Sequence, residues 1–225
     1  MKKIKDTCFI IQSRLNSTRI PGKMLKPFAD STLFEIAIQK LVDSEYIPND
    51  NVFVALYDPK LIGIAKNYPI NIFIREEESV SESQRPSVVS SWHRLPFKHF
   101  VSLNACLPLL SIDTIDSFTN YFMRSRHKSL FAVHETKNFY WDNDGEMITQ
   151  YPGTMNTNLV DNTYSAAHAL YAGSMADIAN DIYLGDFSPN YPELFVIEEK
   201  ETIDVDYMWQ FKQAEILYRN RKELL

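Results

Sequence analysis

The sequence predicts an α/β fold, a single Rossmann-like domain in which a mostly parallel sheet is flanked by helices. Short β-rich runs alternate with segments of helical periodicity through the first 125 of the 225 residues. These β-rich runs are continuously apolar, which is typical of strands that are covered on both faces. No repeat, low-complexity tract or linker-like stretch interrupts the chain, so we expect one domain over residues 1–225.

In the first half, strands and helices are expected to alternate. The apolar, β-rich runs predict strands at 8–13, 51–57, 70–76 and 99–105. Apolar residues at helical spacing predict helices at 31–45, 59–68, 83–95 and 112–125. Ser31 is the expected N-cap of the first helix, Pro59 begins the second, the third follows Pro86, and Asp113 opens the fourth.

The second half is less regular. Residues 129–141 predict a longer strand, and 141–150 a hairpin whose turn is Asp144-Gly145. The Ala-rich segment 164–182 is expected to be helical, 193–199 to be a strand, and 207–225 to be a closing helix.

Ligands of open α/β sheets bind beyond the carboxyl ends of the strands. This rule brings the loops after Ser13, Glu76 and Ala105 around one crevice.

The composition indicates an ordinary globular protein, with 45% hydrophobic residues and a formal net charge of −6. An acidic chain is a poor match for wide nucleic-acid contact, and no apolar run approaches the roughly 20 residues of a membrane span. The apolar run after the basic start is only Cys8–Ile11, so a strand is favoured over a signal peptide. Two cysteines predict no disulfide framework, and we expect a reduced, cytoplasmic protein.

A basic island stands out against this acidic background. Residues 1–26 contain seven Lys or Arg and one acid, and Arg14, Arg19 and Lys23 directly follow the first strand. The island matches neither the Walker A pattern nor the dinucleotide pattern G-x-G-x-x-G. Arginine guanidinium groups and a lysine ammonium group can nevertheless bind a compact anion such as a nucleotide phosphate. The alternative is a solvated surface loop.

Asp204 and Asp206 form a carboxylate pair near the other end of the sequence. Alternation along a strand would bring both onto one face, with Val205 opposite. Hard oxygen ligands of this kind suit Mg²⁺, which takes one or two protein carboxylates together with phosphate oxygens and waters. The alternative for Asp206 is an N-cap of the final helix.

Three stretches resemble the CMP-sugar synthetases, the acylneuraminate cytidylyltransferase family of CTP-dependent enzymes. The stretch "SRLNSTRIPGKML" resembles the signature loop of that family, "LNACLPLL" its Pro-Leu turn, and "IDVDYMWQFKQAE" its closing D-x-D segment. Asn16, Cys106 and Gln210 stand where the family usually has Gly, Asp and Asp, which indicates a divergent member.

The resemblance implies a role for each candidate residue. Lys23 and Arg14 would be catalytic, and Asp204 and Asp206 would bind Mg²⁺. The nucleotide would be bound by Arg14, Asn16, Ser17, Arg19, Lys23, Arg75 and Asn104. Asn104 would read cytosine, because an amide matches both donors and acceptors of that base. The second substrate would meet Lys137, Asn156 and His168, although a lone histidine on an Ala-rich helix is more often a core residue.

The implied reaction transfers CMP from CTP to a sugar acid or another small anionic acceptor and releases pyrophosphate, for cell-surface polysaccharide biosynthesis. Residues 1–125 would bind the nucleotide, and 126–225 would supply acceptor-binding, dimerisation and metal-binding groups of a homodimer. Alternative acceptors are a phosphonate or a phosphorylated metabolite. Alternative functions are a metal-dependent glycosyltransferase or a nucleotide-binding protein without catalysis.

Overall fold

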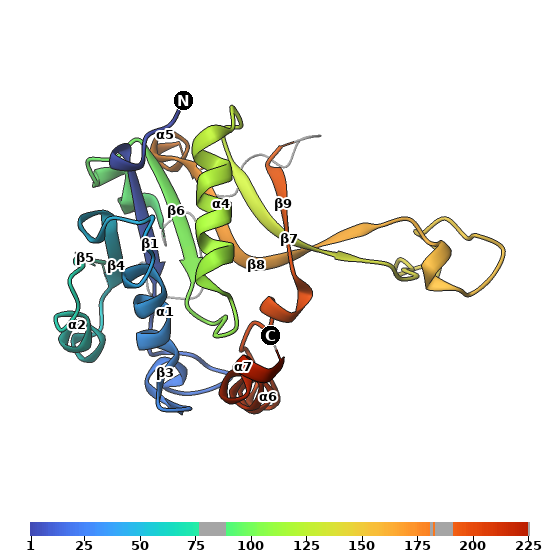
Figure 1. Cartoon of the computed structure of the whole chain (residues 1–225), viewed down its shortest axis with the longest axis horizontal. Helices are drawn as coiled ribbons and strands as arrows, with labels where there is room; N and C mark the ends of the chain where they lie inside the picture. Colours follow the sequence, from blue (N-terminus) through green and yellow to red (C-terminus); the bar gives the residue numbers. More distant parts are fainter. Residues whose placement is uncertain (77–88, 181, 183–190, 225) are drawn as a thin grey trace.

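The computed structural model describes residues 1–76, 89–180, 182 and 191–224. A seven-stranded sheet with the order β5-β4-β1-β6-β8-β7-β9 forms the centre of the molecule (Figure 1). Its strands are β1 Thr7–Gln12, β4 Val52–Leu56, β5 Asn71–Ile74, β6 His99–Asn104, β7 Leu130–Thr136, β8 Thr163–Ser174 and β9 Glu193–Ile197. A separate two-stranded sheet pairs β2 Pro27–Phe28 with β3 Ser31–Thr32.

The helices connect and cover these strands. The α-helices are α1 Leu33–Val42, α2 Pro59–Ala65, α4 Ile112–Arg124, α5 Met175–Ala179, α6 Met208–Arg219 and α7 Arg221–Leu224. The 3-10 helices are η1 Ile4–Asp6, η2 Lys23–Leu25, η3 Asn49–Asn51, η5 Ser90–Arg94, η6 Thr157–Leu159 and η7 Glu199–Glu201.

The sheet is mostly parallel, as the sequence predicted. β1 pairs in parallel with β4 and β6, β4 with β5, and β7 with β9. Only β8 runs against its neighbours, since it pairs antiparallel with both β6 and β7. The predicted α/β class and mostly parallel sheet are therefore confirmed.

Both faces of the central strands are covered. Phe9 and Ile11 of β1 belong to the larger hydrophobic core, which also takes in side chains of α1 and α4. The alternate residues Cys8 and Ile10 belong to a second core on the other face. Burial on both faces removes the need for polar residues in β1, and this explains its continuously apolar sequence.

The expected helix over 164–182 is wrong. Residues Thr163–Ser174 form β8, the longest strand, and only Met175–Ala179 are helical. β8 fills the position between β6 and β7, where backbone pairing on both sides outweighs the helix propensity of its alanines. Gly173 also packs tightly here, because a Cβ at this position would lie 3.1 Å from the ring of Phe100.

Two helix starts differ from the expected ones by a residue or two. Thr32, rather than Ser31, caps α1: its side chain accepts a hydrogen bond from the Glu35 amide at 3.2 Å. α4 starts at Ile112, and its cap is Ser111. Residues 83–88 of the helix expected over 83–95 lie outside the described residues, and within its described part Ser90–Arg94 form a 3-10 helix rather than an α-helix.

The closing helix α6 packs beside the start of the chain. Phe211 contacts Phe28 edge to face, with ring centroids 5.2 Å apart. The Glu215 carboxylate accepts a hydrogen bond from the Ala29 amide at 3.0 Å. These contacts bring the segment before α6 to the carboxyl end of β1. The ligand is predicted to bind at this end of the sheet.

A buried lysine of α1 holds the loop that follows β6. The Lys40 Nζ donates to the carbonyl oxygens of Leu107 and Pro108 at 2.7 and 2.8 Å. Burial lowers the pKa of Lys40 to about 7. The loop that begins at Ala105 is thus anchored from the side of α1.

The chain between β7 and β8 extends away from the sheet as a long arm, residues 137–162 (Figure 1). Near its base the bridge between Trp141 and Met147 encloses the turn with Gly145 at φ +82°, so the predicted hairpin is present. Among the residues that the structure describes, no helix has the length and apolar character needed to cross a membrane.

Candidate active site

The loop after β1 is shaped by local hydrogen bonds. The Ser17 hydroxyl accepts a bond from the Ile20 amide, and the Lys23 amide donates to the Ile20 carbonyl at 3.1 Å. Gly22 stands in the left-handed region at φ +66°, which only glycine adopts without strain, and leads into η2. The Lys23 side chain is consequently turned inward and is only 7% exposed.

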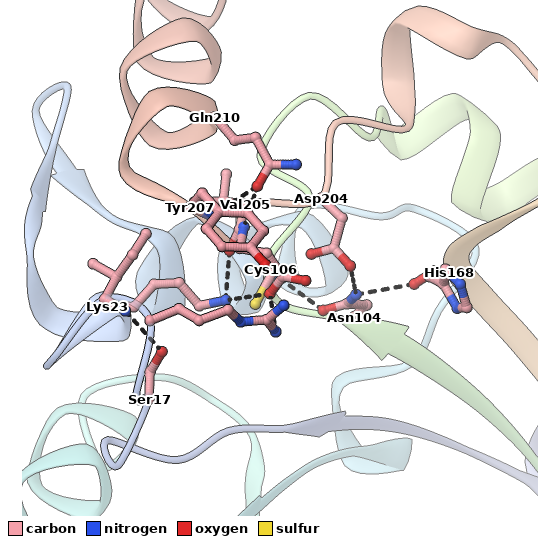
Figure 2. A network of polar contacts seen from close by, with 12 residues as sticks. Ser17, Lys23, Asn104, Cys106, His168, Asp204, Val205, Tyr207 and Gln210 are labelled. Carbon is pink, nitrogen blue, oxygen red and sulfur yellow. Dashed lines mark hydrogen bonds and ion pairs between the residues drawn. The ribbon is translucent and has the colours of Figure 1, made fainter.

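Lys23 contacts the segment that precedes α6. Its Nζ donates to the Val205 carbonyl and lies 3.3 Å from Asp206 Oδ1, across 183 residues of sequence. The same Asp206 oxygen lies 2.7 Å from Arg19 Nη2. Arg19, Lys23 and the carboxylate of Asp206 therefore meet in one place. Figure 2 shows the Lys23 side chain directed towards the segment that contains Val205.

Asn104 links three further parts of this site. Its Nδ2 donates to the His168 carbonyl at 3.0 Å and to Asp204 Oδ2 at 3.3 Å, and its Oδ1 accepts from the Cys106 amide at 2.9 Å (Figure 2). Both amide hydrogens are thus used within the protein. A contact from this nitrogen to cytosine would break one of these bonds, and the geometry favours a positioning role for Asn104.

His168 reaches this network through an irregularity in β8. The pairing with β7 shifts register between Phe131 and Val133, and His168 has a φ of +51°. In a bulge of this kind the backbone can aim a group that a regular strand would direct elsewhere. The carbonyl of His168 faces Asn104, and its side chain is exposed beside the site.

Asp204 and Asp206 fit a divalent cation. Asp204 Oδ1 is buried and has no hydrogen-bond partner among the described residues. Burial, and then the neighbouring Asp206 carboxylate, raise the pKa of Asp204. No cluster of three or more His, Cys, Asp or Glu suited to a metal is present in the described part of the chain. A pair of carboxylates is nevertheless what Mg²⁺ needs when phosphates supply other ligands.

The local structure around the pair differs from the expectation in one respect. Residues 203–206 form an irregular segment rather than a strand. Val205 is still fully buried opposite the two aspartates, and its amide donates to the Cys106 carbonyl at 2.9 Å. The predicted alternation is therefore present without a strand.

Arg75 and Arg14 add positive charge beside the loop. Arg75 follows β5, is 2% exposed, and its amide donates to the Leu56 carbonyl at 2.7 Å. Burial, and then the Arg14 guanidinium, lower the pKa of Arg75 to about 10. Positive charge gathered beside the loop in this way favours the binding of an anion nearby.

The remaining candidates lie further out. Asn16 is an exposed residue of the loop. Lys137 and Asn156 belong to the arm, which extends away from the sheet (Figure 1). The Asn156 side chain accepts a hydrogen bond from the Asn158 amide at the start of η6.

Two residues were not predicted as parts of the site. Gln210 Oε1 accepts hydrogen bonds from the amides of Asp206 and Tyr207, at 2.9 and 2.7 Å. The Tyr207 ring lies 5.4 Å from the Arg19 guanidinium, within reach of a cation–π interaction. The sequence signal for Gln210 was its place three residues after the start of a helix, where Gln reaches back to the cap.

We expect Gln210→Ala to lower the melting temperature, because two amides at the start of α6 lose their acceptor. The loss of a helix cap costs about 1 kcal/mol. Gln213→Ala is the matched control, since Gln213 is an exposed glutamine of the same helix. Equal melting temperatures of the two variants in calorimetry would show that Gln210 does not hold this segment.

Comparisons with known proteins show what this chain is similar to. A curated relative, the spore coat polysaccharide biosynthesis protein SpsF of Bacillus subtilis (strain 168), is 31% identical over 99 residues, which are 38% of this chain and 41% of that protein. This chain therefore matches less than half of the length of that relative.

Solved structures share the fold. CMP:2-keto-3-deoxy-manno-octonic acid synthetase complexed with CTP superimposes with a TM-score of 0.70 at 13% identity, over 96% of this chain and 99% of that one. The 4-diphosphocytidyl-2C-methyl-D-erythritol synthase of Anaerococcus prevotii gives a TM-score of 0.67 at 12% identity, over 95% and 96%. The family model described as "Cytidylyltransferase" matches residues 8–183. The chain belongs to the cytidylyltransferase family.

Proposed function

We propose that this protein is a Mg²⁺-dependent cytidylyltransferase that transfers CMP from CTP to a small anionic acceptor, such as a sugar acid, and releases pyrophosphate. The observation that carries the proposal is the contact between Lys23 and Asp206, which joins the basic loop to the carboxylate pair. Family membership supports the use of CTP. The name of the relative SpsF supports a place in polysaccharide biosynthesis.

In the proposed reaction an acceptor oxygen attacks the α-phosphorus of CTP, and the bond to the bridging oxygen of pyrophosphate breaks. Negative charge grows on the phosphate oxygens, and fixed cations stabilise it. We assign Lys23 to the α-phosphoryl group, since a buried amine acts in a low dielectric. Arg14, Arg19 and Ser17 would hold the β- and γ-phosphates.

Asp204 and Asp206 would hold Mg²⁺, which supplies charge neutralisation and orientation of the phosphates when bound. Without nucleotide, the Asp206 carboxylate is shared by Arg19 and Lys23. A triphosphate offers both cations a stronger partner and thereby frees Asp206. This exchange couples nucleotide binding to metal binding, so each should strengthen the other.

The acceptor would approach from the side of His168, whose exposed side chain lies beside Asn104. A phosphonate or phosphorylated metabolite is the second acceptor class. A glycosyltransferase would instead transfer from a preformed nucleotide sugar and would release no pyrophosphate from CTP. A screen of pyrophosphate release from CTP, UTP and ATP against sugar acids, phosphonates and phosphorylated metabolites separates these functions.

We also propose a homodimer formed through the arm, in a reducing, cytoplasmic environment. The arm exposes large apolar side chains, including Trp141 at 50% and Ile148 at 69%. A two-stranded extension with exposed apolar groups is marginally stable alone and gains by packing on another surface. The free thiols of Cys8 and Cys106 support the reducing environment.

Lys23→Met is expected to lower the turnover of cytidylyl transfer by about 10²–10³-fold, because the α-phosphoryl group loses its buried cation. Lys26→Met, a change of the same type in the same loop, is the control and should stay near wild type. Circular dichroism would establish that both variants are folded. Near-normal turnover of folded Lys23→Met would remove Lys23 from the mechanism.

Asp206→Asn is expected to change CTP binding in two opposite ways. Without metal, CTP should bind more tightly, because Arg19 and Lys23 no longer have a competing carboxylate. The gain in affinity on adding Mg²⁺ should disappear. Calorimetric titration measures both effects, with Asp50→Asn as an exposed control. An unchanged response to Mg²⁺ would count against the metal assignment.

Trp141→Ser/Ile148→Ser is expected to halve the mass measured by light scattering, from a dimer to the 26.1 kDa monomer. Trp209→Ser/Ile216→Ser is the matched control, because these residues are 64% and 61% exposed on α6. A wild-type protein that is already monomeric at micromolar concentration would contradict the proposed dimer.

A further inference from the structure

A second cationic region lies at the end of the sheet opposite the candidate active site. It is a cavity of about 870 Å³ whose lining includes Lys2, His99 and Ser174. Lys2 precedes β1, His99 begins β6, and Ser174 ends the antiparallel strand β8. His99 and Asn104 are the two ends of β6, roughly 16 Å apart at the rise of a strand. The cavity is therefore separate from the nucleotide site.

The charged side chains that line this cavity are mostly cationic, whereas the whole chain has a negative net charge. Four cationic side chains and one carboxylate, Asp177, line it, while the chain carries a net charge of −6. The cationic side chains are Lys2, Arg124, Arg126 and Lys128. His99, His127, Ser125 and Ser174 also line the cavity. His127 Nδ1 lies 3.6 Å from a carboxylate oxygen of Glu193.

The cations are held in different ways. Lys2 is fixed: its Nζ donates to the carbonyls of Phe122 and Ser125, at 3.2 and 3.0 Å. Arg124, Arg126 and Lys128 are exposed, and no carboxylate of the described residues forms an ion pair with them.

The fixed Lys2 amine and the three exposed cations of the cavity repel one another. An anion bound between them would relieve this repulsion.

His99 supplies a second observation. Its Nδ1 is buried and has no hydrogen-bond partner among the described residues. Burial, and then the nearby Lys2 cation, lower the pKa of His99. An anion in the cavity would offset the charge of Lys2 beside this ring.

The dipole of α4 explains only part of the cluster. A cation in the last turn of a helix is favourable, and Arg124 ends α4. Arg126 and Lys128 lie beyond the helix, where the influence of the dipole is weak, and they lead directly towards β7.

We propose that this cavity binds a compact polyvalent anion of the phosphate class, such as a pyrophosphate or a nucleoside polyphosphate. A volume of 870 Å³ is within the range of small-molecule sites, roughly 300–1,000 Å³. A long nucleic acid would need a wider basic face than this acidic chain offers. The proposed anion site does not depend on the proposed cytidylyl transfer, so the two proposals are tested separately.

Histidine signals can locate the binding directly, because the chain has only five histidines. In an NMR titration with inorganic pyrophosphate and no divalent metal, the imidazole signals of His99 and His127 should move and saturate. His168 reports separately on the nucleotide site. Movement of His168 alone would place the anion in the active site and would overturn the proposal.

Charge reversal tests the same site. Arg126→Glu/Lys128→Glu should weaken the pyrophosphate affinity measured by His99 and His127 at least about tenfold. Lys60→Glu/Lys66→Glu is the matched control, since both lysines are exposed and lie near α2 at the β5 edge of the sheet.

Equal affinity in the two double variants would overturn the proposal, provided that both melt like the wild type. Binding of heparin or RNA at these histidines with no response to pyrophosphate would overturn the assignment to a compact ligand.

Discussion

The contact of the Lys23 amine with Val205 and Asp206 is the interaction on which the site depends. An almost fully buried amine is unfavourable unless oxygen atoms surround it, and here a carbonyl and a carboxylate do so. The pairing fixes the loop after β1 against the segment before α6. Asn104, at the end of β6, then ties that segment through Asp204 to the bulge of β8 at His168. The ends of β1 and β6, the bulge of β8 and the start of α6 are thereby held as a unit.

Backbone hydrogen bonds order the rest of this site. The Cys106 amide donates to Asn104 Oδ1, and the Cys106 carbonyl accepts from the Val205 amide. Gln210 likewise acts through hydrogen bonds to the amides of Asp206 and Tyr207. These hydrogen bonds hold the segment that carries Asp204 and Asp206.

The basic island of the sequence is divided by the fold. Lys2 lies at the amino end of β1 and Arg19 beyond its carboxyl end, so one cluster of cations in the sequence supplies two regions of the molecule. At the amino end of the sheet, Lys2 lines the same cavity as three cations from the last turn of α4 and the segment after it: Arg124, Arg126 and Lys128. These three residues are far from the basic island in the sequence. An acidic protein thus has cationic regions at both ends of its sheet.

The sequence by itself determined the α/β class, the parallel core and the loop chemistry, because continuous apolar strands and closely spaced cations are local properties. The resemblance to related enzymes also implied roles for Lys23 and Asp206 in one reaction, and the structure brings these two side chains into contact. Tertiary structure decided the rest. Residues 163–174 are a strand because β6 and β7 both offer backbone hydrogen-bond partners. The Ala-rich local sequence contains no information about these distant strands. Asn104 is engaged by His168 and Asp204 because pairing across the sheet brings them together, and hydrogen bonds between distant residues leave no periodic signal in a sequence.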